Sequence, residues 1–203
     1  MEGLPLHFSD VEIRSFEYTS LVTGVGYSVL AAMRNRQCWI AGAVSSVCAA
    51  IAYGANGLPM QSGLQVFFVG MALYGWISWT RSAAEGELPV SLWPFRNHLI
   101  AAVLITALSL GIASLLAANT DAAAWPRLDS LTTWFSLLAT WLVARGKLEN
   151  WLYWIVVDGL ALYLYWQREL YLFVGLFALY LVLVVIGLIR WHRDWRAQSM
   201  VPA

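Results

Sequence analysis

One short stretch of the chain carries most of the side chains that could bind a polar molecule. It contains Glu149, Asn150, Trp151, Trp154 and Asp158. On a helix, Trp151, Trp154 and Asp158 share one face, because residues three, four and seven positions apart lie one above the other. A carboxylate flanked by indole faces suits a flat aromatic cation, through charge pairing and cation–π attraction. The alternative is a structural role, in which Asp158 bonds a neighbouring Ser or Tyr and the indoles only pack.

A second stretch could supply another part of the same binding site. Gln65, Ala72, Trp76 and Trp79 recur at intervals that place them on one side of a helix. Polar and aromatic side chains that face inward from an apolar helix are candidates for binding a solute. We therefore expect Gln65 and Trp76 to contact the bound molecule.

Signals for enzyme chemistry are weak. The three histidines, His7, His98 and His192, lie outside the apolar runs, and no pair has the spacing of metal ligands. The sequence has no Gly-x-x-x-x-Gly-Lys-Ser/Thr loop for a nucleotide and no Gly-x-Ser-x-Gly elbow for a nucleophile. We expect no catalytic residue, metal or cofactor, and a binding function in place of an enzymatic one.

Composition identifies the elements that must position these residues. Hydrophobic residues make up 60% of the chain and charged residues 12%, whereas soluble chains have roughly 45–50% and about 25%. The sequence therefore predicts an integral membrane protein that contacts the lipid bilayer. Formal net charge is zero, which disfavours a nucleic-acid partner. A belt of indoles at the membrane surface would explain four of the tryptophans without a ligand: Trp39, Trp79, Trp191 and Trp195.

Seven apolar runs are candidates for membrane-spanning helices, each of which needs about 20 residues. They lack the strict alternation that is typical of strands. The predicted helices cover residues 16–33, 38–53, 62–80, 99–118, 131–144, 148–166 and 171–189. Most of the basic residues fall in connections on one side, which the positive-inside rule places in the cytoplasm: Arg34, Arg36, Arg81, Arg96, Arg145, Lys147, Arg190, Arg193 and Arg196. This orientation puts the N-terminus outside and the C-terminus in the cytoplasm.

The chain also repeats itself. A shift of 112 positions superposes identical residues without a gap: Trp39 on Trp151, Tyr53 on Tyr165, Gly63 on Gly175, Gly75 on Gly187 and Trp79 on Trp191. Accidental matches in a chain rich in tryptophan are the alternative explanation.

The repeat constrains the architecture. Three spans reverse the direction of the chain, so two three-helix repeats share an orientation only when an odd number of spans separates them. We predict one all-α transmembrane domain of 3+1+3 helices, with parallel repeats over about residues 16–80 and 129–191 and a linker helix over about 99–118. Transporters with parallel repeats bind substrate between the repeats, near the membrane midplane.

Three motifs carry a resemblance to a known family. At Gln65-Val66-Phe67-Phe68, Tyr74-Gly75-Trp76 with Trp79, and Glu149-Asn150-Trp151 with Trp154, the chain resembles the PnuC family of bacterial vitamin transporters. The resemblance covers nearly the whole chain, from about residue 17 to residue 191. It implies a SWEET-like fold, a homotrimer, and passive uptake of a vitamin across the bacterial inner membrane. The vitamin is typically nicotinamide riboside, and a cytoplasmic kinase traps it after uptake.

The resemblance also implies which residues contact the substrate: Gln65, Trp76, Asn150, Trp151, Trp154 and Asp158. Two positions depart from the nicotinamide riboside members, because Asp158 and Ala72 stand where an asparagine is usual. Thiamine, which is also a cationic heteroaromatic molecule, is therefore an alternative substrate. A membrane-embedded enzyme, a non-transporting receptor for a kinase, and an ion-coupled carrier are further alternatives.

Overall fold

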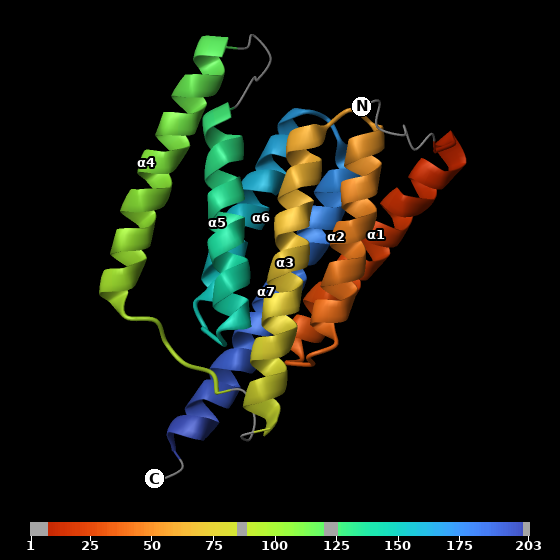
Figure 1. The fold of residues 1–203 in the computed structure, drawn as a ribbon. Coiled ribbons are helices and arrows are strands. Elements are labelled where there is room, and N and C mark those ends of the chain that lie inside the picture. Colours follow the sequence, from red (N-terminus) through yellow and green to blue (C-terminus); the bar gives the residue numbers. More distant parts are fainter. Residues whose placement is uncertain (1–7, 85–88, 120–125, 201–203) are drawn as a thin grey trace. The chain divides into compact units, whose positions relative to one another are not determined.

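The described part of the chain is helical. A computed structural model describes residues 8–84, 89–119 and 126–200. These residues form seven helices and no extended strand (Figure 1): α1 Asp10–Ala32, α2 Cys38–Ala55, α3 Pro59–Ala84, α4 Phe95–Asn119, α5 Pro126–Ala144, α6 Asn150–Gln167 and α7 Tyr171–Ser199. The prediction of an all-α protein with seven helices is confirmed.

The helices form two compact units, which divide after residue 86. The first unit contains α1, α2 and α3, and α2 packs against both of the others. The second unit contains α4 to α7, and each of these helices packs against the next one along the chain. The first predicted repeat therefore falls in the first unit, and the linker helix and the second predicted repeat fall in the second.

Both units turn the chain at corresponding positions. The helices α2 and α6 begin and end at residues 112 positions apart. The corner before each contains one residue with positive φ, Arg34 at 56° and Gly146 at 63°. The corner after each does the same, with Gly57 at 71° and Glu169 at 58°. Left-handed backbone favours glycine, so each unit has one corner with a glycine and one with a larger residue in this conformation.

Several helices extend beyond the apolar runs that predicted them. The helix α1 begins at Asp10, because Ser9 and Glu12 form a capping box in which each side chain accepts from the backbone N–H of the other. The helix α4 begins at Phe95, and α7 continues to Ser199. The length of an apolar run predicts which part of a helix a membrane could cover. The capping residues and the corners determine where the helix begins and ends.

Among the described residues, two helices have the length and hydropathy to cross a bilayer by themselves. These are Cys38–Ala55 and Tyr171–Ser199. Shorter apolar helical stretches occupy Phe95–Gly111 and Leu131–Ala144. The prediction of seven membrane-spanning helices goes beyond this finding and stays a prediction.

Candidate functional site

The helix α6 carries four of the predicted binding residues. Asn150, Trp151 and Asp158 are 0%, 3% and 5% exposed, and Trp154 is half-buried. Asp158 lies in the middle of the helix, two turns beyond Asn150. Three of these four side chains are therefore buried within the second unit.

Asp158 is a buried carboxyl group in the middle of an apolar helix. No described residue donates a hydrogen bond to its carboxylate. Tyr180 on α7 interacts with it electrostatically. The predicted structural alternative, a hydrogen bond to a neighbouring Ser or Tyr, therefore has a nearby tyrosine but no hydrogen bond. A carboxylate in an apolar region is costly unless it meets a donor or a cation. This position therefore favours a ligand that supplies one of these.

Asn150 already has one structural bond. Its Nδ2 donates to the carbonyl oxygen of Lys147 at 2.6 Å, which closes the corner before α6. Its Oδ1 is buried and has no partner among the described residues. An unpaired buried acceptor is rare, so the carbonyl end of this amide is the part of Asn150 that remains for a ligand.

Trp151 packs between α6 and α7. Its ring meets that of Trp191 edge-on, with centroids 5.5 Å apart, and it lies directly against Gly187. In the first unit, the residues 112 positions earlier make the same contact, with the rings of Trp39 and Trp79 edge-on at 5.6 Å. A role for Trp151 in substrate binding stays a prediction, while its packing role is visible.

The membrane-surface interpretation is wrong for three of the four tryptophans to which it was applied. Trp39, Trp79 and Trp191 are 2%, 3% and 0% exposed. Gly75 on the neighbouring helix leaves room for the indole of Trp39. The rings of Trp79 and Trp191 pack edge-on against those of Trp39 and Trp151. The fourth, Trp195, is half-buried, with its ring 5.8 Å from that of His192.

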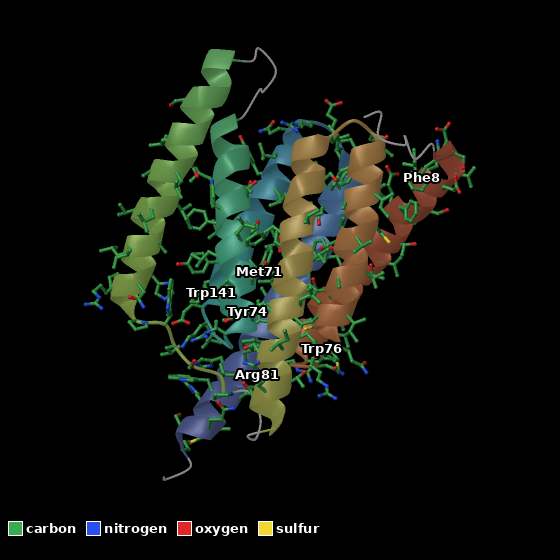
Figure 2. All side chains as sticks on the ribbon, viewed as in Figure 1. Phe8, Met71, Tyr74, Trp76, Arg81 and Trp141 are labelled. Atoms are coloured by element: carbon green, nitrogen blue, oxygen red, sulfur yellow. The ribbon has the colours of Figure 1, made fainter. Side chains whose placement is uncertain are left out.

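The predicted residues of the first unit lie on α3. Gln65 and Trp76 are both half-buried; Figure 2 labels Trp76 on this helix. The guanidinium of Arg36 lies 5.5 Å from the centre of the Trp76 ring, which is within the range of a cation–π contact. One face of this indole thus already meets a cation, and its role toward a substrate stays a prediction.

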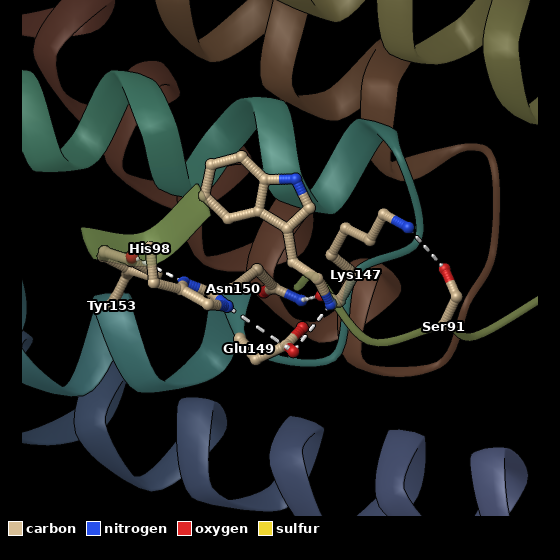
Figure 3. Close-up of polar contacts among 7 residues, drawn as sticks. Ser91, His98, Lys147, Glu149, Asn150 and Tyr153 are labelled. Carbon is tan, nitrogen blue, oxygen red and sulfur yellow. Dashed lines mark hydrogen bonds and ion pairs between the residues drawn. The ribbon is translucent and has the colours of Figure 1, made fainter. Parts of the chain in front are cut away.

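A polar network around Glu149 was missed. Its Oε1 accepts from the backbone N–H of Trp93 at 2.7 Å and lies 3.6 Å from Nε2 of His98. His98 in turn bonds the hydroxyl of Tyr153 through Nδ1, at 2.8 Å (Figure 3). The partners are about fifty residues apart in sequence, so spacing alone offers no signal for them.

A metal or catalytic centre is not evident in the part of the chain that the structure describes. It holds no group of three or more His, Cys, Asp or Glu side chains placed to hold a metal ion. The second unit holds a buried carboxylate, a buried amide and the half-buried indole of Trp154, which are groups that can bind a polar aromatic molecule.

Comparison with known proteins identifies relatives. Residues 14–193 match the family described as nicotinamide mononucleotide transporter. The riboflavin/roseoflavin transporter RibM of Streptomyces davaonensis is 29% identical over 148 residues, which cover 70% of this chain and 66% of RibM. The nicotinamide riboside transporter PnuC of Escherichia coli is 26% identical over 133 residues, which cover 53% of this chain and 56% of PnuC. The matched region thus spans less than two thirds of the length of these relatives.

A solved structure shares the fold. The crystal structure of the vitamin B3 transporter PnuC superposes with a TM-score of 0.70 over 94% of each chain, at 19% sequence identity. The family match covers most of the chain, and the resemblance in the motifs of α3 and α6 agrees with it. The chain belongs to the PnuC family of transporters.

Proposed function

We propose that this protein carries a cationic vitamin, nicotinamide riboside in the first instance, across the bacterial inner membrane by facilitated diffusion, without chemically changing it. The observation that carries this proposal is the buried Asp158 carboxylate in the middle of α6, with the half-buried Trp154 one turn before it. A positively charged pyridinium ring would pair with the carboxylate and lie against an indole face. The PnuC relative, a nicotinamide riboside transporter, supports the same substrate class.

The proposal includes the membrane arrangement. All seven helices cross the bilayer as 3+1+3, with two parallel three-helix repeats and the C-terminus in the cytoplasm. The matching corners of α2 and α6 support the repeat. Lipid contact is supported by large apolar side chains that are more than half exposed on α4, such as Leu99, Val103 and Leu104.

Two partners complete the proposal. The protein acts as a homotrimer, and a cytoplasmic kinase phosphorylates the vitamin after its release, so that net uptake continues without an energy source in the carrier. Phosphorylation adds negative charge to the vitamin, and a charged phosphate does not return through an apolar region. The mass of the purified protein in detergent, compared with the 22.6 kDa chain, tests the trimer.

Riboflavin is a second candidate substrate. The RibM relative is matched at higher identity and over a larger share of this chain than the PnuC relative. Riboflavin is a neutral flavin, so Asp158 would then accept a hydrogen bond from it in place of pairing with a cation. Thiamine, which is cationic, remains a third candidate because Asp158 replaces an amide of the nicotinamide riboside members.

A ligand panel on the detergent-purified protein tests the substrate. A ligand that binds only the folded state stabilises it by about 2.7 kcal/mol at one hundred times its dissociation constant. We expect nicotinamide riboside to raise the melting temperature, with thiamine and riboflavin giving smaller shifts. A shift with riboflavin alone would transfer the proposal to the second candidate, and no shift with any of the three would reject it.

Counterflow in liposomes tests the mode of transport. Labelled substrate should enter vesicles preloaded with unlabelled substrate, in the absence of nucleotide, and it should be recovered chemically unchanged. A dependence of this exchange on a proton or sodium gradient would contradict facilitated diffusion. Loss of the substrate to a new product would contradict a carrier and favour an enzyme.

A further inference from the structure

The segment before α4 joins the corner between α5 and α6. The backbone N–H of Ser91 donates to the carbonyl of Gly146 at 3.0 Å, and the N–H of Leu148 donates to the carbonyl of Ser91 at 3.0 Å. The Lys147 ammonium also donates to the Ser91 hydroxyl, at 2.9 Å. These contacts form an isolated parallel bridge between Ser91 and Lys147. A connecting segment is thus held to the start of α6 (Figure 3).

Glu149 adds a second layer of contacts to the same corner. Its carboxylate accepts from the Trp93 N–H at 2.7 Å, a short bond because the acceptor is charged. The His98 ring lies 3.6 Å from the same oxygen, and both side chains are under 20% exposed. In a neutral His98, a proton on Nε2 faces the carboxylate, and Nδ1 accepts from the Tyr153 hydroxyl. The chain of contacts therefore runs from Trp93, which precedes α4, through Glu149 to His98 on α4, and from His98 to Tyr153 on α6.

The corresponding corner of the first unit lacks these groups. The residues 112 positions before Lys147, Glu149 and Tyr153 are Asn35, Gln37 and Ala41. The Gln37 side chain makes no capping bond, and Ala41 has no hydroxyl. The Asn35 Oδ1 accepts a local bond, from the Gln37 N–H at 2.9 Å. The contacts around Glu149 are thus an addition to the second unit, and forming a corner does not require them.

We propose that Glu149, His98 and Tyr153 are positioning residues that clamp the segment 91–98 to the start of α6 and so fix the binding face of this helix. Asn150, Trp151 and Trp154 occupy the first two turns after Glu149. A displacement of about 1 Å in a binding group is enough to weaken its interactions severely. The clamp acts on the substrate through α6. Only its effect on transport rests on the proposed function.

Binding measurements in nanodiscs test the positioning role. Glu149→Ala should weaken nicotinamide riboside binding about tenfold or more, because it removes a charged acceptor from a half-buried network. Glu149→Gln should fall between this variant and wild type, because its amide oxygen still accepts from the Trp93 N–H. Gln37→Ala, at the corresponding position of the first unit, is the matched control and should leave binding unchanged. An unchanged affinity in Glu149→Ala would overturn the proposal.

A covalent bridge separates positioning from direct contact with the substrate. The Ser91 and Lys147 side chains already converge, so Ser91→Cys with Lys147→Cys should form a disulfide that replaces the clamp. The native Cys38 and Cys48 are buried and free. Oxidation of this pair in the Glu149→Ala background should restore affinity to within about threefold of wild type. If oxidation leaves the affinity low, Glu149 acts in some other way and the proposal fails.

Hydrogen exchange tests the clamp without any ligand. Glu149→Ala should speed exchange of the Trp93 and Leu148 amides about tenfold or more, while Gln37→Ala should not. Tyr153→Phe, which removes a single hydroxyl, gives the same readout if Glu149→Ala does not fold. Unchanged exchange in these variants rejects the clamp even where the vitamin binds. Faster exchange in a protein that binds no vitamin would reject the proposed function and retain the clamp.

Discussion

The indole of Trp151 occupies the space that a side chain at position 187 would need. A Cβ atom on Gly187 would stand 2.5 Å from the Trp151 ring, closer than carbon atoms approach without a clash. In the first unit, Trp39 lies against Gly75 in the same way and even more closely. The second and third helices of each repeat are thus joined by an indole that lies in a notch made by glycine, with a second indole edge-on beside it.

This contact predicts that Gly187→Ala is destabilising. The added methyl group must displace a buried Trp151, and overpacking of this kind costs about 1–3 kcal/mol. Thermal unfolding in detergent should show a lower melting temperature. Gly175→Ala on the same helix is the control, because nothing lies within 4 Å of its Cβ position, and it should be neutral or slightly stabilising. Equal melting temperatures for the two variants would show that the notch is not tight.

A charge requirement at Asp158 follows from the proposed function. Asp158→Ala should weaken nicotinamide riboside by roughly 2–5 kcal/mol, the usual cost of removing one partner of a desolvated charge pair. Asp158→Asn should also weaken the binding of nicotinamide riboside, although less. Neither variant should weaken the binding of riboflavin to the same extent. Calorimetric titration of each ligand into wild type and both variants checks this.

The folded state should tolerate these changes at Asp158. Removing a buried carboxylate that has no hydrogen bond from the described residues costs little packing and removes a desolvation penalty. The melting temperature without ligand should therefore be unchanged or raised. Wild-type affinity for nicotinamide riboside in Asp158→Asn would show that the negative charge is not used.

Glu169 offers a stabilising substitution. It has a φ of 58° in the corner after α6, where the first unit has Gly57 at 71°. In the left-handed region a non-glycine residue destabilises the folded state by roughly 1–2 kcal/mol. A glycine avoids this strain, but part of the gain is lost because glycine gives up more conformational entropy on folding. Glu169→Gly should therefore raise stability by about 1 kcal/mol, measured as a higher melting temperature. Gly57→Ala should do the opposite, and a stabilising Gly57→Ala would contradict the corner geometry.

The stability of the first turn of α1 should depend on pH. Hydrogen bonds from the Ser9 backbone N–H and hydroxyl hold the pKa of the Glu12 carboxyl below its ordinary value. A lowered folded-state pKa means that the capping interaction is fully present above the ordinary glutamate value and is lost as the pH falls through the lowered one. A carboxyl titration followed by NMR should show the low pKa in wild type and a rise toward the ordinary value in Ser9→Ala. Identical titrations in the two proteins would show that the capping box is not formed.

Apolar run length predicted the existence and order of the helices but not their ends. The capping pair Ser9 and Glu12 lies before the first apolar run, so a hydropathy argument passes over it even though the Ser-x-x-Glu pattern is readable. The residues of α6 from Asn150 to Asp158 can be proposed from sequence alone because they are close together in the chain and lie on one helix, and their role in binding stays a prediction. His98 carries no such signal, because it lies outside the apolar runs and its partners Glu149 and Tyr153 are distant in the chain.

By itself, the sequence determined what repeats locally: seven apolar segments, a register of 112 residues, and a polar face on the sixth helix. Those features depend on spacing along one chain, which helical geometry converts directly into direction. Only the tertiary structure decided that Trp39, Trp79 and Trp191 are buried instead of lying in a surface belt, and that Glu149 holds the segment before α4. Contacts of that kind depend on which helix packs against which, and close packing between distant segments has no signature in the spacing of either one.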